Sequence, residues 1–487
     1  MKRVLAVAGV AIVVLFAVLA INASRMPSRQ PIAGPPDTTA IDAAAVAGRL
    51  GEAIRIRTIS RGDGAPADVA AIEAFHAFLA RAYPRTHAAL PHERVRNGIV
   101  YAWNAGAPGK PILLASHIDV VPVEEGTEST WTHPPFAGEI ADGFVWGRGA
   151  LDDKTGVIAI FDAVESLLAQ GYTPARPVWL AFGADEEVGG DDAKAMAAHF
   201  AAKGVRFELV LDEGLAILQD QLPGVTKPVA MFAVAEKGYA DLELSAKGAG
   251  GHSSMPPKDT ATAVLATALV RLGENPMPAE LSGPVRETLE TLAPEMPFAQ
   301  RLALSNLWLF APVVKRAFEA KPATNASLRT SMAVTMLKGS PKDNVLPLHA
   351  TAVVNVRLFP GDTGAEVLEH ARRVIDDARV ELRLLGGFAS EASEVSPSSG
   401  PAWDLLARAA RSSLGDVLVA PGLTLGGTDA RHYSTVADAA YRFAPLVMRP
   451  EDNVRVHGTD ERISVENCGL AVRFYRRVIT EAGGPPP

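Results

Sequence analysis

The sequence predicts an α/β protein: a mostly parallel sheet with helices on both faces, interrupted by an inserted α+β module. The first observation is that strand-like and helix-like segments alternate between residues 98 and 214, which favours parallel strands covered by helices. The second is that apolar and polar residues alternate after Glu236, as in half-exposed strands. The third is that the α/β pattern resumes at Pro401, in a chain of 487 residues that has room for two domains.

The individual elements follow from apolar periodicity and from Gly and Pro boundaries. In the α/β part, Asp68 is the expected N-cap of the second helix, and the helices expected there cover residues 43–54, 69–82, 155–168, 193–203 and 401–413. The strands expected there are GIVYAWNA, PILLASHIDVV, PVWLAFGA and FELVLDEG. In the inserted module we expect helices over 260–272 and 365–377 and the strands ADLELSAKG, VTMLKGS, HATAVVNVRLF and VELRLL.

These elements divide the chain into five parts. Residues 1–25 are a signal anchor or signal peptide, and 26–40 are a Pro- and Thr-rich linker. Residues 41–236 and 394–487 are the two parts of the catalytic domain, and 237–393 form the inserted lid or dimerisation domain.

The N-terminal segment predicts a membrane-crossing helix. Lys2 and Arg3 precede an unbroken apolar run from Val4 to Ile21, which is just long enough to span a bilayer. Positive charge before the run favours a chain whose bulk lies outside the cytoplasm. A cleaved signal peptide is the alternative, because small residues follow the run. We therefore expect a periplasmic, lumenal or extracellular catalytic domain, either membrane-anchored or secreted.

Composition excludes several classes of protein. The formal net charge is −8, whereas a nucleic-acid-binding surface requires a basic face. Cys468 is the only cysteine, so an intrachain disulfide and a zinc site of several thiolates are both impossible. Its place on the apolar face of an expected helix predicts a buried filler rather than a nucleophile.

Histidines and carboxylates stand at the C-terminal ends of the expected strands, where parallel α/β sheets bind ligands. His117 and Asp119 share one strand face, as suits a histidine ligand with a supporting carboxylate, although a surface pair is the plainer alternative. Asp152 and Asp153 precede an apolar helix. Helix capping explains one of these two acids but not both.

Three further positions repeat this pattern. Glu186 and Glu187 end a strand in ADEEVGG, and adjacent side chains point apart, so one can bind metal while the other acts as a base. Asp212 and Glu213 end FELVLDEG, and His457 lies in RVHGTDERI. Solvated loops are the plainer alternative for each position alone. Together, histidines and carboxylates without cysteine favour zinc, with cobalt or manganese as possible substitutes.

The motifs, in this order, resemble the di-zinc metallopeptidase family of aminoacylase, carboxypeptidase S and succinyl-diaminopimelate desuccinylase. They are SHIDVVP, WGRGALDDKTG, DEEVGG, VLDEG, GGHSSMPP, NVLP, NVRLFPG, GGTDAR and HGTDERI. The resemblance extends from about Ile54 to Tyr475. WTHPPFAGEIADGFVWGRGALDDK and LSNLWLF are most similar to the subgroup of carboxypeptidase S, a glycine-X carboxypeptidase, and the secreted N-acyl-amino-acid hydrolases.

The resemblance implies two Zn²⁺ ions per subunit. His117 and Asp212 would hold one ion and Glu187 and His457 the other, with Asp152 bridging the two.

The resemblance also implies three roles beside the metal. The peptide bond from Asp152 to Asp153 would be cis. Asp119 would orient His117, and Glu186 would be the general base.

In the inserted domain, the resemblance implies that His252 reaches across a homodimer to polarise the scissile carbonyl. Arg357 and Asn344 resemble substrate-binding residues, and an arginine suits a carboxylate. Gly426 and Gly427 would present N–H groups to the same carboxylate. A loop histidine, a surface arginine and ordinary turn residues are the plainer alternatives.

The sequence thus predicts zinc-dependent hydrolysis of an amide beside a free carboxylate, in a dipeptide or an N-acyl amino acid. Alternatives are an N-acyl-amino-acid synthase/hydrolase for long acyl chains, a desuccinylase, and an inactive binding protein on a peptidase fold. The apolar stretch 296–318 is expected to pack in a core, with an acyl channel or a membrane-facing surface as alternatives.

Overall fold

The computed structural model describes residues 1–62, 64–386 and 389–484, and its centre is an eight-stranded mixed sheet. The order is β1-β2-β6-β3-β7-β16-β8-β15, and the neighbours β6, β3, β7 and β16 run parallel. The strands are β1 (His92–Val95), β2 (Gly98–Trp103), β3 (Ile112–His117), β6 (Val178–Gly183), β7 (Leu209–Leu218), β8 (Val229–Glu236), β15 (Leu418–Thr424) and β16 (Ala440–Met448). The mostly parallel sheet expected from the sequence is confirmed.

Helices cover both faces of this sheet. Within β3, Ile112 and Leu114 belong to the core under one set of helices, whereas Leu113 and Ala115 belong to the core under the other. This alternation is what a doubly covered strand requires. The first set is α2 (Ala43–Arg55), α3 (Val69–Ala82), α5 (Lys154–Ala169), α13 (Pro401–Ser413) and α15 (Val465–Gly483), and the second is α6 (Asp191–Ala202) and α14 (Ala430–Tyr433).

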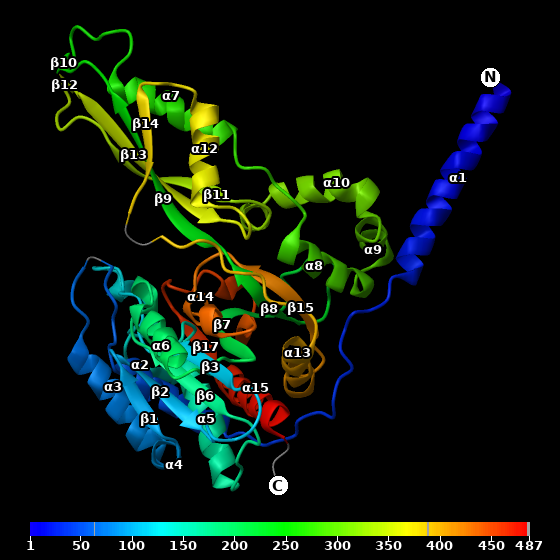
Figure 1. Cartoon of the computed structure of the whole chain (residues 1–487), viewed down its shortest axis with the longest axis vertical. Coiled ribbons are helices and arrows are strands. Elements are labelled where there is room, and N and C mark those ends of the chain that lie inside the picture. The colour runs from blue at the N-terminus through cyan, green and yellow to red at the C-terminus, as the bar shows by residue number, and fades with distance from the viewer. Residues whose placement is uncertain (63, 387–388, 485–487) are drawn as a thin grey trace.

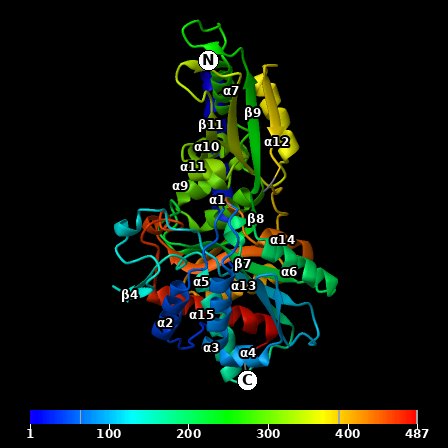
Figure 2. The ribbon, with the colours of Figure 1, turned by 90° about the vertical axis from the view of Figure 1, so that its left-hand side faces the viewer.

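A second, antiparallel sheet stands above the first (Figure 1, Figure 2). Its order is β11-β13-β9-β14, and α7 and α12 pack on it around a separate apolar core. The bounds are β9 (Gly238–Lys247), α7 (Ala261–Glu274), β11 (Ser331–Lys338), β13 (His349–Leu358), α12 (Gly364–Ile375) and β14 (Val380–Leu384). Buried and half-buried residues alternate along β9 and β13, which confirms the inserted α+β module. The boundaries at 237 and 393 stay a prediction.

The helices between residues 283 and 326 were not among the elements expected from the sequence. They are α8 (Gly283–Leu292), α9 (Phe298–Leu304), α10 (Leu307–Glu319) and α11 (Pro322–Ala326). Pro284, Pro297 and Pro322 stand at or just before helix starts, where proline's fixed φ is tolerated, so the segment breaks into short helices. Part of the apolar stretch 296–318 packs in a small core, as expected.

The remaining elements are short. They are α4 (Pro84–Ala89), the three-stranded sheet of β4 (Glu139–Ala141), β5 (Phe144–Trp146) and β17 (Arg462–Ser464), and the pair β10 (Gly251–His252) with β12 (Val345–Leu346). Single turns of 3₁₀ helix lie at Glu128–Thr130, Glu186–Val188, Ala293–Glu295, Ser434–Val436 and Pro450–Asp452. The expected N-cap is present, because Asp68 accepts the N–H of Ala71 at 3.0 Å.

The N-terminal helix α1 (Lys2–Arg25) projects from the body (Figure 1). It is long and apolar enough to cross a membrane, as its sequence predicts, and most of its residues are exposed. Cys468 lies on α15 and is buried, as expected.

Candidate metal centre

His117, the last residue of β3, is held on both sides by carboxylates. Its Nδ1 lies 3.1 Å from the backbone oxygen of Asp119 and 3.3 Å from Asp119 Oδ1, and its Nε2 lies 3.0 Å from Asp152 Oδ1. Burial alone would lower the pKa of His117, but Asp119 and Asp152 raise that pKa well above its usual value. The surroundings of this imidazole therefore favour positive charge.

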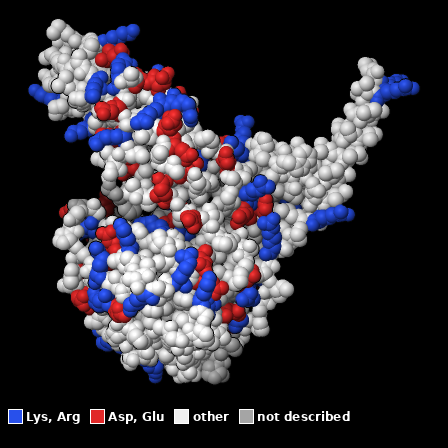
Figure 3. Space-filling view, in the orientation of Figure 1, with Lys and Arg blue, Asp and Glu red and all other residues white. Residues whose placement is uncertain are grey.

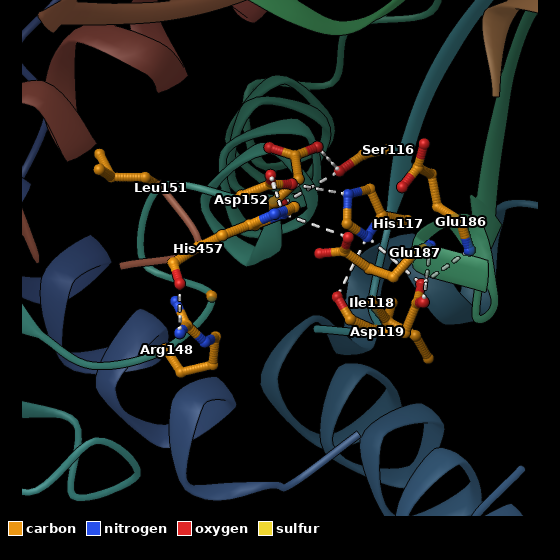
Figure 4. A network of polar contacts seen from close by, with 12 residues as sticks. Ser116, His117, Ile118, Asp119, Arg148, Leu151, Asp152, Glu186, Glu187 and His457 are labelled. Atoms are coloured by element: carbon orange, nitrogen blue, oxygen red, sulfur yellow. Dashed lines mark hydrogen bonds and ion pairs between the residues drawn. The ribbon is translucent and has the colours of Figure 1, made fainter. Parts of the chain in front are cut away.

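Asp152 lies between two histidines (Figure 4). Its Oδ1 faces His117, and its Oδ2 lies 3.1 Å from Nε2 of His457. The same nitrogen of His457 lies 3.2 Å from Glu187 Oε2. The peptide bond from Asp152 to Asp153 is cis, as the resemblance implied. One carboxylate facing two imidazoles is the arrangement that a bridging metal ligand requires.

Two groups of donor atoms share Asp152. His117, Asp152 and Glu213 form one group, and Asp152, Glu187 and His457 form the other; within each group the donor atoms lie within 4.8 Å of one another. Imidazole nitrogens and carboxylate oxygens are the ligands of zinc, cobalt and manganese. In addition, the buried Oε1 of Glu187 has no hydrogen-bond partner among the described residues, although buried polar atoms are normally paired. These residues fit divalent cations.

The expected ligand Asp212 lies in neither group, and its neighbour Glu213 takes that place. Both residues are in β7, where consecutive side chains point to opposite faces. Asp212 is paired in register with Arg442 of β16, whereas burial and then the charges of Asp152 and Glu186 raise the pKa of Glu213 well above its usual value. Asp212 therefore lies outside both groups of donor atoms, although its buried Oδ2 also has no hydrogen-bond partner among the described residues. Which of the two acids binds metal stays a prediction.

Glu186 lies beside the ligand groups and belongs to neither. The N–H groups of Glu186 and Glu187 donate to Oδ1 and Oδ2 of Asp119, each at 3.2 Å. Asp119 therefore contacts His117 and also fixes the turn that carries both glutamates. Burial, followed by the charges of Asp429 and Glu187, raises the pKa of Glu186 well above its usual value. A carboxylate that binds a proton this readily is suited to general base chemistry.

Glu461 and Arg148 form a buried support that the sequence analysis did not single out. Oε1 of Glu461 accepts the N–H groups of Gly149 at 3.0 Å, Leu151 at 2.7 Å and Asp152 at 3.3 Å. Arg148 donates to Oε2 of Glu461 at 2.5 Å and to the backbone oxygen of His457 at 3.0 Å. The only sequence signal was a second acid in HGTDERI.

The expected substrate-binding residues lie in three places. His252 and Asn344 are near the tip of the inserted unit, where the N–H of Ser253 donates to the backbone oxygen of Asn344 at 3.1 Å (Figure 1). Arg357 is near the end of β13, with its guanidinium 4.7 Å from the ring centre of Tyr239. None of these residues joins the ligand groups.

Gly426 and Gly427 follow β15, in the α/β part of the chain. Thr428, directly after them, donates its N–H and its hydroxyl to Glu236 Oε2 at 3.2 and 2.6 Å. These two hydrogen bonds hold the turn that contains the glycines against Glu236, where the chain enters the inserted unit.

A mixed sheet with histidines and carboxylates gathered at its strand ends, and an antiparallel unit inserted after β8, defines a metal-dependent hydrolase. The chain belongs to peptidase family M20/M25/M40, whose model matches residues 113–481. It is therefore a hydrolase of the metallopeptidase class.

Relatives extend over nearly the whole chain. A probable carboxypeptidase S-like protein of Dictyostelium discoideum is 38% identical over 474 residues, which are 95% of this chain and 91% of the relative. An N-fatty-acyl-amino acid synthase/hydrolase of Mus musculus is 40% identical over 440 residues, 88% and 86% of the two chains. The crystal structure of an M20 metallo-carboxypeptidase from Sulfolobus solfataricus has a TM-score of 0.65 at 16% identity and covers 91% of this chain and 99% of its own.

Proposed function

We propose that this hydrolase cleaves an amide bond beside a free carboxylate, in an N-acyl amino acid or a dipeptide, with two Zn²⁺ ions bound per subunit. The observation that carries the proposal is the pair of ligand groups that share Asp152, with Glu186 adjacent and outside both. His117 and Glu213 complete one site, and Glu187 and His457 complete the other.

The protein's own residues perform the proton transfers. Divalent ions in these sites supply a Lewis acid that polarises the amide carbonyl and lowers the pKa of water. Glu186 accepts a proton from the attacking water and delivers it to the leaving nitrogen. Its raised pKa suits it to hold that proton between the two steps. Asp119 keeps His117 oriented and holds the turn of Glu186 in place.

The inserted domain binds the substrate carboxylate and completes the site. Arg357 offers a bidentate partner for a carboxylate, and Gly426 and Gly427 of the α/β part contribute further donors. Asn344, which lies beside His252 at the tip of the inserted unit, contributes a donor together with that histidine. The partner subunit's His252 stabilises the oxyanion in a homodimer formed through this domain. The exposure of His252 at the tip of the unit supports a role toward a second subunit.

The group on the amino side of the scissile amide distinguishes two versions of this function, because one relative is named for a carboxypeptidase and another for fatty-acyl amino acids. The panel that decides it contains N-acetyl, N-palmitoyl and glycyl derivatives of one amino acid, assayed with and without a chelator. Metal-dependent hydrolysis of any member supports the proposal, and preference for palmitoyl assigns the long-chain activity. Absence of hydrolysis in protein with bound metal would instead indicate a binding protein.

The location proposed for this activity is outside the cytoplasm. Lys2 and Arg3 precede the apolar part of α1, and positive charge before such a helix favours its cytoplasmic end. Fusion of a reporter that is active only in the cytoplasm to the C-terminus tests this orientation, and full reporter activity would contradict it.

A further inference from the structure

Helix α10 exposes large apolar side chains on the side that faces away from the protein. Leu307, Val314 and Phe318 pack against the small core under α8 and α9. Trp308 and Val313, on the other side, are each 66% exposed. The outer side also carries Lys315, Arg316 and Glu319, and basic residues beside exposed Trp and aliphatic side chains are typical of a helix that lies in a membrane interface. Here the inner side is covered by protein and the outer side is not.

The foot of α1 is fixed at the start of α10. Asn22 of α1 donates to Oδ1 of Asn306 at 2.7 Å, and Asn306 donates to the backbone oxygen of Leu19 at 3.1 Å. Asn306 is the residue before α10, and it is fully buried, as is Ala23 of α1. Removal of α1 would take away two partners of a buried amide, which costs free energy. These bonds would be kept only in a chain that retains α1.

The hydrogen bonds at this junction fix the point at which α1 leaves the body of the protein. A bilayer crossed by α1 must begin near that point. In Figure 1, α10 lies on the side of α9 toward which α1 extends. Figure 3 shows an almost uncharged surface that continues from the foot of α1 onto the helices beside it. Within the described parts of the chain, no acidic side chain pairs with the exposed Arg25, Arg316 or Lys321.

We propose that the outer side of α10, formed by Trp308, Leu309 and Val313, lies in the interfacial layer of the bilayer that α1 crosses, on an anionic phospholipid surface. Tryptophan and aliphatic side chains beside free basic residues are what such interfaces bind. The proposal depends on α1 remaining on the chain and not on the substrate of the enzyme. Two membrane contacts, one spanning and one interfacial, would hold the catalytic domain in a fixed orientation.

A cysteine label tests the proposal in the full chain. The native Cys468 is fully buried, and burial raises the pKa of its thiol to about 12, so a thiol reagent reacts with a new surface cysteine instead. Val313→Cys carries an environment-sensitive fluorophore, and Val270→Cys, which is 57% exposed on α7, carries the same fluorophore as the matched control. Both proteins are reconstituted in vesicles of phosphatidylcholine and phosphatidylglycerol, and their intact mass verifies that α1 is present.

We expect the label at residue 313 to shift its emission to the blue and to be quenched by brominated lipids, while the label at residue 270 behaves as in water. Equal emission and equal weak quenching at both positions would overturn the proposal. A blue shift that depends on protein concentration, without lipid quenching, would assign the surface to a second copy and would also overturn it. Hydrolysis by the labelled proteins is measured in parallel, so a failure here is distinct from a failure of the proposed function.

Native fluorescence gives a second readout. Trp308 is 66% exposed, whereas the other five tryptophans are each at most 8% exposed. Brominated lipids should therefore quench part of the wild-type tryptophan emission and none of it in Trp308→Phe. Equal quenching in both proteins would contradict the assignment of Trp308 to the interface.

Discussion

Arg148 and Glu461 form an ion pair with side chains that are 4% and 0% exposed, although they lie more than half the chain apart in sequence. The pair joins the segment that carries Asp152 to the loop that carries His457. It therefore helps to set the distance between Asp152, which both groups of donor atoms share, and His457, which belongs to one of them. Residues that orient metal ligands in this way commonly contribute to metal affinity.

Replacement of Glu461 by glutamine should weaken metal binding. Glutamine preserves the shape of the side chain but removes the charge that holds Arg148 and three backbone N–H groups. We expect affinity to fall about 10- to 100-fold, the usual effect of losing a group behind a ligand. Competition with a fluorescent chelator measures it. Glu466→Gln, an exposed change on α15, is the matched control, and equal affinities in the two variants would contradict this role.

Glu213→Gln and Asp212→Asn test which acid of β7 is a ligand. The first change should reduce the bound metal, because the amide of glutamine is a poor replacement for a carboxylate ligand. The second should leave the metal content near that of the wild type and lower the thermal midpoint, because Asp212 lies opposite Arg442. Elemental analysis after gel filtration measures the metal. The opposite result would restore Asp212 as the ligand.

This pair of residues also shows where prediction from sequence ends. Strand-end acids were visible in FELVLDEG, but the choice between two adjacent acids depends on which face of β7 each side chain occupies. His117, Glu187 and His457 were proposed as ligands because each lies in a distinctive motif, and each belongs to a candidate group of donor atoms. Glu461 was missed because its role depends on a three-dimensional contact with Arg148 from a distant segment.

The fold shows a similar division. Helices with clear apolar periodicity were predicted to within a few residues, and the expected range 69–82 matches α3 (Val69–Ala82). The short helices between residues 283 and 326 were not predicted. Helices α9 and α11 have seven and five residues, which are too few to show an apolar period, and their stability comes from tertiary packing. The longer α8 and α10 do have apolar periodicity, but the stretch 296–318 was considered only for its apolar content.

Glu186→Gln should separate catalysis from metal binding. The amide cannot accept the proton from water, and loss of a general base typically lowers the rate by about 10²- to 10⁴-fold. Metal content should stay near the wild-type value, because Glu186 lies outside both ligand groups. Turnover of the preferred member of the amide panel and elemental analysis are measured on the same sample. Undiminished turnover would show that another group accepts the proton.

Mixing two inactive variants tests whether His252 acts across a dimer. His252→Ala keeps Glu186, and Glu186→Gln keeps His252, so a mixed dimer contains one site with both groups intact. If subunits exchange freely, half of the dimers are mixed, and about a quarter of the wild-type activity per site should return. Activity is followed after co-refolding or co-expression of the two variants. Failure to recover activity in a dimer shown to be mixed would mean that His252 acts within its own subunit and not across the dimer.

Stability in acid should depend on His76, a buried residue of α3 far from the metal groups in sequence. Burial lowers the pKa of His76 to about 4 from its usual 6.5, while the bond of its Nε2 to the backbone oxygen of Asn97 at 2.9 Å opposes this. The unfolded chain therefore takes up this proton first as the pH falls below 6.5. Stability is lost between pH 6.5 and 4, by about 3 kcal/mol at 1.36 kcal/mol per pKa unit. His76→Gln retains a donor toward Asn97, and denaturant unfolding should show a shallower fall in its stability than in wild type or in the exposed control His349→Gln. Parallel curves would mean that the pKa of His76 is the same in the folded and unfolded states and that other groups cause the acid sensitivity.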